Sequence, residues 1–176
     1  IKKVFVNSGI RYDLINEDKE YGQTYLKEIV EHHVSGQMKI APEHSEEKIL
    51  SLMGKPDKKT LLDFKKKFDD LNKQLGKKQF LTYYMIAAHP GCTEEDMKKL
   101  KDFANRELRL SPEQVQIFTP TPSTYSTLMY YTGLNPWTLK PIFVETDMGK
   151  KQKQKDMVVE KRVCSKKPKG DYDINL

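Results

Sequence analysis

Two stretches of the chain repeat one pattern, in which a short apolar run ends at a proline-containing polar corner and a capped helix follows. The first stretch spans residues 38–54, and the second spans residues 80–97. Apolar runs that alternate with helices in this way build α/β proteins, whose ligands bind at the carboxyl ends of parallel strands. The corners differ from ordinary loops in what they carry, because Glu43 and His44 lie in the first and His89 lies in the second.

The rest of the chain continues this alternation in the order β-α-β-α-α-β-α-β. Such alternation predicts a parallel sheet with right-handed crossovers. We therefore expect about four parallel strands with flanking helices, the strands lying at residues 3–7, 38–41, 80–88 and 115–119. Helical spacing of apolar residues predicts helices at residues 25–33, 45–53, 58–75 and 93–108, with Ser45 and Thr93 as N-caps of the second and the fourth.

An aromatic stretch follows the last expected strand. It contains Tyr125, Met129, Tyr130, Tyr131 and Trp137. Such side chains either stack on bases or rings, or cover the core as a lid. We favour the lid because aromatic side chains bury a large area.

The apolar pattern stops near Gly149, which divides the chain into residues 1–148 and a basic tail, residues 149–176, that we expect to be disordered. Of the formal net charge of +6, the tail carries +5 and the first part only +1. A basic tail can contact nucleic acid or an acidic partner, but lysine-rich termini are more often only solubilising. Nucleic acid is therefore a partner that we do not favour.

No apolar run approaches the roughly 20 residues that a membrane-spanning helix needs, so we expect a cytoplasmic protein without a membrane partner. Residue 1 is Ile rather than Met, which suggests a fragment or a processed product. Cys92 and Cys164 form no C-x-x-C pair, so we expect no metal site within the chain. Cys92 precedes a helix, where a thiol pKa tends to fall, but no base lies next to it in sequence.

The expected strand ends bring polar side chains to one crevice, and they are the candidate cofactor-binding residues: Arg11, Glu43, His44, His89, Thr119, Thr121 and Thr124. An arginine, a glutamate, two histidines and several hydroxyl groups suit a polar ligand with carboxylate, amine and ribose groups. Taken singly, Glu43 could instead cap a helix, and either histidine could be an ordinary loop residue. Their position at successive strand ends favours a functional crevice, although no residue is identified as catalytic.

Several linked motifs carry a resemblance to a known family. They include Ala-Pro-Glu-His at 41–44, Met-Gly-Lys-Pro at 53–56, His-Pro-Gly-Cys-Thr-Glu-Glu-Asp-Met at 89–97, Phe-Thr-Pro-Thr-Pro-Ser-Thr at 118–124 and Met-Tyr-Tyr-Thr-Gly at 129–133. Together they resemble the YgiQ-like group of radical S-adenosylmethionine proteins over residues 1–147. Two positions depart from that pattern: Cys92 stands where related enzymes often have Glu, and Ser123 stands where Gly is usual.

The resemblance implies a partial (β/α) barrel that binds a [4Fe-4S] cluster and S-adenosylmethionine at its strand ends and generates a 5′-deoxyadenosyl radical. The family's C-x-x-x-C-x-x-C motif is absent here and would lie upstream. The chain thus resembles the later half of such a barrel, inactive alone, with the upstream half as its partner and an unknown substrate. The alternative is a non-catalytic α/β binding module with a basic tail.

Overall fold

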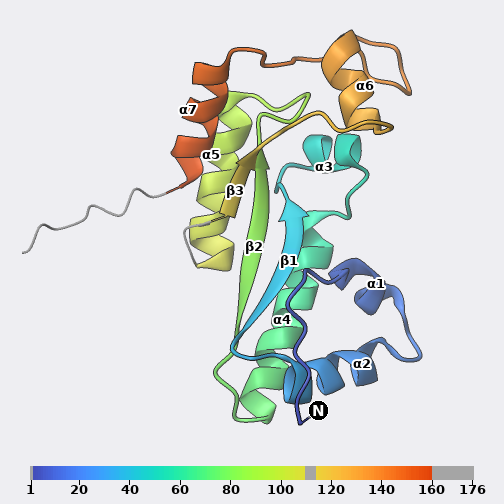
Figure 1. The fold of residues 1–176 in the computed structure, drawn as a ribbon, viewed down its shortest axis with the longest axis vertical. Helices are drawn as coiled ribbons and strands as arrows, with labels where there is room; N and C mark the ends of the chain where they lie inside the picture. The colour runs from blue at the N-terminus through green and yellow to red at the C-terminus, as the bar shows by residue number, and fades with distance from the viewer. Residues whose placement is uncertain (1, 110–113, 160–176) are drawn as a thin grey trace, which may run out of the picture.

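The computed structural model describes residues 2–109 and 114–159, and it contains one parallel sheet of three strands flanked by helices (Figure 1). The strands are β1 (Gln37–Glu43), β2 (Phe80–Ala87) and β3 (Gln114–Ile117), in the order β1-β2-β3. Met38 pairs with Leu81 and Met85 pairs with Val115, so the register follows the apolar pattern. The α/β class and the parallel direction are confirmed, and the barrel stays a prediction.

Nine helical segments flank the sheet. They are α1 (Tyr12–Glu17), α2 (Gly22–Glu28), the π-helix η1 (Ile29–His33), α3 (Glu47–Met53), α4 (Lys58–Gln74), α5 (Glu94–Phe103), the π-helix η2 (Ala104–Leu108), α6 (Tyr125–Thr132) and α7 (Met148–Val158), counted over the described residues. Thr93 caps α5 in a reciprocal capping box with Asp96, as its sequence predicts. Ser45 is not an N-cap, because α3 begins one residue later, with Glu46 in that position.

The two faces of the sheet differ in burial. Leu81, Tyr83 and Met85 of β2 are buried in the core together with Phe64 and Phe68 of α4. The alternate β2 residues are half-buried except for the exposed Phe80, and β1 shows the same alternation after its exposed first residue. Within the described residues the sheet therefore has one face packed on helices and one face that is only partly covered.

The strand that we expected at residues 3–7 does not form. This segment makes one backbone hydrogen bond to η1, from the Val6 amide to the His33 carbonyl at 2.9 Å. A single parallel bridge, Ile10 with Ile40, follows, and the next residues form the unpredicted helix α1. The segment lacks a continuous ladder of partners, so the described sheet has three strands rather than four.

The expectation of a disordered tail from residue 149 is wrong for residues 149–158, which belong to α7. Asp147 caps α7. The helix lies beside α5 and β3 (Figure 1). Its buried positions are Lys151, Gln154 and Val158. Two of the three are polar, so hydropathy alone does not reveal the buried stripe. Residues 160–176 of the expected tail lie outside the described residues. Among the helices of residues 2–109 and 114–159, none combines the length and the apolar character of a membrane span.

Candidate functional site at the strand ends

The ends of β1 and β2 share an unusual backbone. Glu43 (φ 67°) ends β1 and Ala88 (φ 58°) follows β2, and both adopt the left-handed conformation. This conformation costs a non-glycine residue about 1–2 kcal/mol, so the surrounding structure must enforce it. A buried histidine comes directly after each of them: His44 after Glu43, and His89 after Ala88. The sheet thus builds the same corner twice, on neighbouring strands.

His44, in the β1 corner, is a neutral side chain with a defined tautomer. The Glu46 amide donates to its Nδ1 at 3.0 Å, so the imidazole proton of the neutral ring lies on Nε2. Nε2 lies 3.5 Å from the Sγ of Cys92, which comes from the β2 corner. Burial lowers the pKa of His44 to about 4, with the nearby Asp96 carboxylate acting in the opposite direction. At neutral pH the ring is uncharged and donates towards sulfur.

Cys92 contacts a histidine, His44, although no base lies next to it in sequence. The expectation that its thiol pKa falls is wrong. Burial, and secondarily the Asp96 carboxylate, raises the pKa of the thiol to about 12. The thiol donates to the Thr93 carbonyl at 3.7 Å and accepts from His44. A thiolate–imidazolium pair needs both groups charged, and burial disfavours both charges. The His44–Cys92 contact is therefore a neutral hydrogen bond.

His89, in the β2 corner, has the opposite tautomer. Its Nδ1 lies 2.8 Å from the Pro90 carbonyl oxygen, which only accepts, so Nδ1 carries the proton. Nε2 is then an acceptor, and the Ser126 hydroxyl of α6 donates to it at 2.8 Å. Burial lowers the pKa of His89 to about 4, and the bond to Pro90 only partly offsets this. A serine beside an imidazole can act as a nucleophile, but so low a pKa makes a weak base.

The two corners touch each other as well as resembling each other. Lys48 of α3 forms an ion pair with the buried Asp96 of α5 at 2.8 Å. Gly91 (φ 87°) packs so closely on Leu52 that an added Cβ would lie 2.5 Å from the Leu52 Cδ1 atom. The backbone conformation therefore favours glycine at position 91, and a larger residue there would also force the Leu52 side chain to shift.

Residues from α6 and α7 complete this region, and the sequence did not single them out as site residues. Gln154 of α7 accepts from the Ala88 amide at 3.1 Å, which fixes the left-handed residue of the β2 corner. Its Nε2 is buried and has no hydrogen-bond partner within the described structure. Lys151, one helical turn earlier, donates to the Tyr130 hydroxyl at 2.9 Å.

The other predicted site residues form separate groups. Arg11 pairs with its own neighbour Asp13, with one bond at 2.9 Å, and Glu43 pairs with Lys55 at 2.8 Å. Arg11, Asp13 and Lys55 line a hollow of about 120 Å³ beside the end of β1. Their charges are therefore already paired inside the chain.

The three predicted threonines lie in the loop after β3 and are exposed. Thr124 caps α6, and its hydroxyl donates to the Thr121 carbonyl at 3.1 Å. Thr119 bonds only to the Ile117 carbonyl among the described residues, at 3.4 Å. The threonines therefore organise the loop and α6, and none of these bonds reaches the two histidines.

The described residues do not by themselves fit the cofactors that the resemblance implies. They contain no group of three or more His, Cys, Asp or Glu side chains that could hold a metal ion. The hollow at the end of β1 is smaller than the roughly 300–1,000 Å³ of ordinary small-molecule sites. The polar side chains of both corners bond mainly to each other, so this part of the chain can form at most one wall of a cofactor site.

The aromatic residues after β3 divide into two groups. Met129 is buried, and the Tyr130 ring packs against Phe118, which in turn meets the His89 ring edge-on at 5.2 Å. Tyr125, Tyr131 and Trp137 are more than half exposed. The lid interpretation is therefore wrong for those three side chains within the described residues.

Comparison with known proteins identifies similar sequences of unassigned function. A family model described as a domain of unknown function, DUF3362, matches residues 113–159. A UPF0313 protein of Fusobacterium nucleatum subsp. nucleatum is 67% identical over 162 residues, covering 92% of this chain and 28% of that protein. A UPF0313 protein of Clostridium perfringens is 48% identical over 158 residues, covering 90% and 23%. The chain thus spans about a quarter of the length of these relatives.

Among solved structures, the archaeal Methanocaldococcus infernus Elp3 with an N-terminal deletion is similar at a TM-score of 0.39. The sequences are 19% identical, and the match covers 74% of this chain and 35% of that one. A likeness this weak supports no conclusion on fold or function.

Proposed function

We propose that this chain is the later part of a radical S-adenosylmethionine core domain, and that the β1 and β2 corners form one wall of its cofactor and substrate site. The observation that carries the proposal is the repeated corner, in which a left-handed residue precedes a buried, uncharged histidine at neighbouring parallel strand ends. Strand ends of parallel sheets are where α/β proteins bind ligands. The motif resemblance supplies the cofactor class, and the substrate stays open.

The partly covered face of the sheet supports the same proposal. Lys39, Thr82 and Tyr84 lie on this face, and all are half-buried. A barrel interior has this character, since its inward side chains meet residues from strands across the barrel. The upstream part of a longer protein, including the cluster cysteines, would then supply the rest of the wall.

Within this proposal, the chain's own residues hold the ligand in position and exclude water from it. They take no part in the reaction as reacting groups. Phe118 packs against one side of the His89 ring and Tyr130 packs against Phe118, while the Ser126 hydroxyl meets the Nε2 acceptor of His89. Rotation of the Ser126 hydroxyl away from this ring would offer Nε2 to a donor on the ligand, such as an amine or a ribose hydroxyl.

The test uses the full-length protein, reconstituted anaerobically with iron and sulfide. Binding of S-adenosylmethionine is measured by equilibrium dialysis for the wild type and for His89→Ala, with Lys66→Gln, an exposed lysine of α4, as the matched control. We expect about tenfold weaker binding for His89→Ala and no change for the control. Equal affinity in all three proteins would overturn the assignment of His89.

Formation of 5′-deoxyadenosine by the reduced wild type distinguishes the two function classes. Product supports the radical enzyme. Iron uptake and product both at background would instead favour the non-catalytic binding module as the function of the longer protein.

A further inference from the structure

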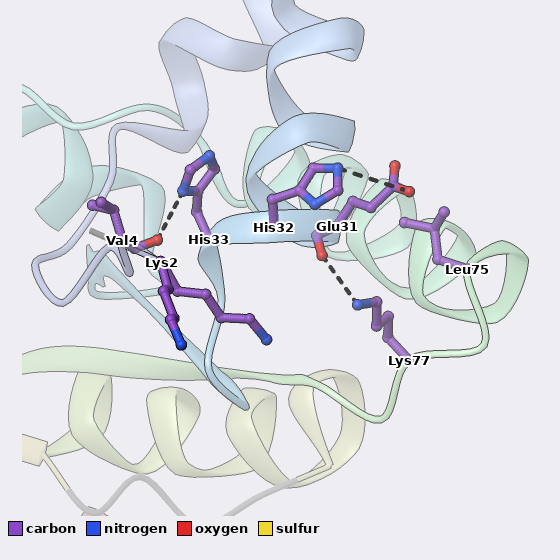
Figure 2. Close-up of a pocket in the computed structure, with 8 residues that line it drawn as sticks. Lys2, Val4, Glu31, His32, His33, Leu75 and Lys77 are labelled. Carbon is purple, nitrogen blue, oxygen red and sulfur yellow. Dashed lines mark hydrogen bonds and ion pairs between the residues drawn. The ribbon is translucent and has the colours of Figure 1, made fainter.

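A hollow of about 570 Å³ lies at the amino-terminal edge of the sheet, away from the strand-end corners (Figure 2). Three segments surround it: residues 2–4, the end of η1 at residues 31–33, and the turn after α4 at residues 75–77. η1 and this turn directly precede β1 and β2, so the hollow is set where both strands begin. Its volume is within the range of ordinary small-molecule sites.

Positive charge dominates the lining. Lys2, Lys3 and Lys77 line the hollow together with His32. Glu31 supplies the one carboxylate of the lining. None of the three lysines forms an ion pair within the described residues, and Lys77 Nζ instead donates to the Glu31 carbonyl at 3.0 Å. The Glu31 carboxylate lies 3.9 Å from His32 Nε2 rather than beside a lysine. The three ammonium groups therefore form no ion pair in this part of the chain, and they outnumber the single carboxylate of the lining.

Specific hydrogen bonds hold the three segments together. His33 Nδ1 donates to the Val4 carbonyl at 2.8 Å, which ties the amino-terminal segment to η1 (Figure 2). Gln79 Nε2 donates to the Val30 carbonyl at 2.9 Å and to the Val34 carbonyl at 3.2 Å, which ties the turn after α4 to both ends of η1. The lysines are thus presented by segments in fixed relative positions, which lowers the entropy lost when a ligand binds.

We propose that this hollow binds the phosphate groups of a phosphorylated small molecule. Lysine ammonium groups recognise phosphate as point charges and form charge-assisted hydrogen bonds with its oxygens. Three lysines that line one hollow favour a ligand with two or more negative charges over a ligand with a single carboxylate. The site is separate from the strand-end corners, so it stands or falls independently of the proposed radical function.

The test measures binding of inorganic pyrophosphate to the full chain by isothermal titration calorimetry at low salt. The variants are Lys77→Gln and the double variant Lys2→Gln/Lys3→Gln. The matched control is Lys78→Gln, which removes an exposed lysine next to Lys77 that does not line the hollow. Far-ultraviolet circular dichroism verifies that all variants are folded.

We expect each lining variant to bind pyrophosphate about tenfold more weakly than the wild type, with the control unchanged. Weakening by Lys78→Gln equal to that by Lys77→Gln would mean nonspecific attraction and would overturn the proposal, as would absence of binding to the wild type. A second titration uses a short oligothymidylate. Binding of the oligonucleotide tighter than that of pyrophosphate, and lost in the lining variants, would overturn the small-molecule assignment in favour of nucleic-acid phosphates.

Discussion

The corner after β1 and the corner after β2 share a backbone design but use their histidines in opposite ways. His44 accepts at Nδ1 from the Glu46 amide and donates from Nε2 towards a buried thiol. His89 donates from Nδ1 to the Pro90 carbonyl and accepts at Nε2 from the hydroxyl of Ser126. The same residue type, at the same place after a left-handed residue, therefore presents a proton in one corner and a lone pair in the other.

The difference shows what each corner is built for. Both partners of the His44 ring belong to the β1 and β2 corners themselves, so this histidine joins the corners. Ser126, the partner of His89, comes from α6. This helix carries exposed side chains such as Tyr125 and Tyr131 in the described structure. We infer that, within the proposed wall, His44 holds the two corners together and His89 is the histidine available to a ligand.

The largest effect that we expect is a loss of stability in acid. Burial holds the pKa of both histidines near 4 in the folded chain, against about 6.5 when unfolded. Between pH 6.5 and pH 4 the unfolded chain binds more protons, so the free energy of unfolding falls as the pH falls, by about 3 kcal/mol per histidine. Urea unfolding across this pH range measures the loss.

Two substitutions separate these histidines from other titrating groups. His44→Asn keeps an acceptor for the Glu46 amide, and His89→Gln keeps one for Ser126, but neither new side chain titrates. The double variant should therefore lose about 6 kcal/mol less than the wild type over the same window. Equally steep curves for the two proteins would show that the histidines are not buried and neutral.

The next effect concerns the thiol that faces His44. With its pKa raised to about 12 by burial, Cys92 should react with iodoacetamide at pH 8 about a thousandfold more slowly in the folded chain than in urea. A Cys164→Ala background isolates Cys92 in mass spectrometry. Fast labelling of the folded protein would instead indicate an activated thiolate–imidazolium pair in the β1 corner.

Removal of the Ser126 hydroxyl tests the β2 corner alone. Ser126→Ala should lower the free energy of unfolding by about 1 kcal/mol, because the buried Nε2 acceptor of His89 loses its donor. Ser51→Ala, at an exposed position of α3, is the control and should change it by less than about 0.5 kcal/mol. Equal effects of the two substitutions would show that the hydrogen bond between Ser126 and His89 does not stabilise the folded chain.

The smallest effect concerns backbone strain. Ser123 adopts a left-handed conformation (φ 62°), so Ser123→Gly should stabilise the chain by about 0.5 kcal/mol, the relief of strain outweighing the added entropy of the unfolded state. Ala88→Gly also relieves strain, but it removes a buried methyl group worth about 0.8 kcal/mol and should give no gain. Thermal unfolding of both variants checks this contrast, and destabilisation by Ser123→Gly would contradict it.

Local patterns explain which features could be predicted. Short apolar runs located β1 and β2, and the Thr93–Asp96 spacing located the start of α5. The pairs that define the site are long-range, however: Cys92 meets His44 across 48 positions, and Ser126 meets His89 across 37. No local pattern encodes such contacts.

The burial of polar side chains explains why the sequence did not predict α7. α7 buries Lys151 and Gln154, which hydropathy assigns to solvent, so the sequence resembled a tail. The prediction for residues 3–7 was wrong in the other direction, since the apolar residues there suggested a strand, whereas the segment makes a single backbone–backbone hydrogen bond to η1. Both errors arise because tertiary partners, rather than local preference, decide these segments.

The most direct test is a long-range ¹⁵N–¹H correlation spectrum of the histidine rings at pH 6.5. The account predicts two neutral rings of opposite tautomer, with the proton of His44 on Nε2 and that of His89 on Nδ1, and neither ring titrating down to about pH 5. His44→Asn and His89→Gln assign the signals. Identical tautomers, or titration of either ring near pH 6.5, would contradict the account.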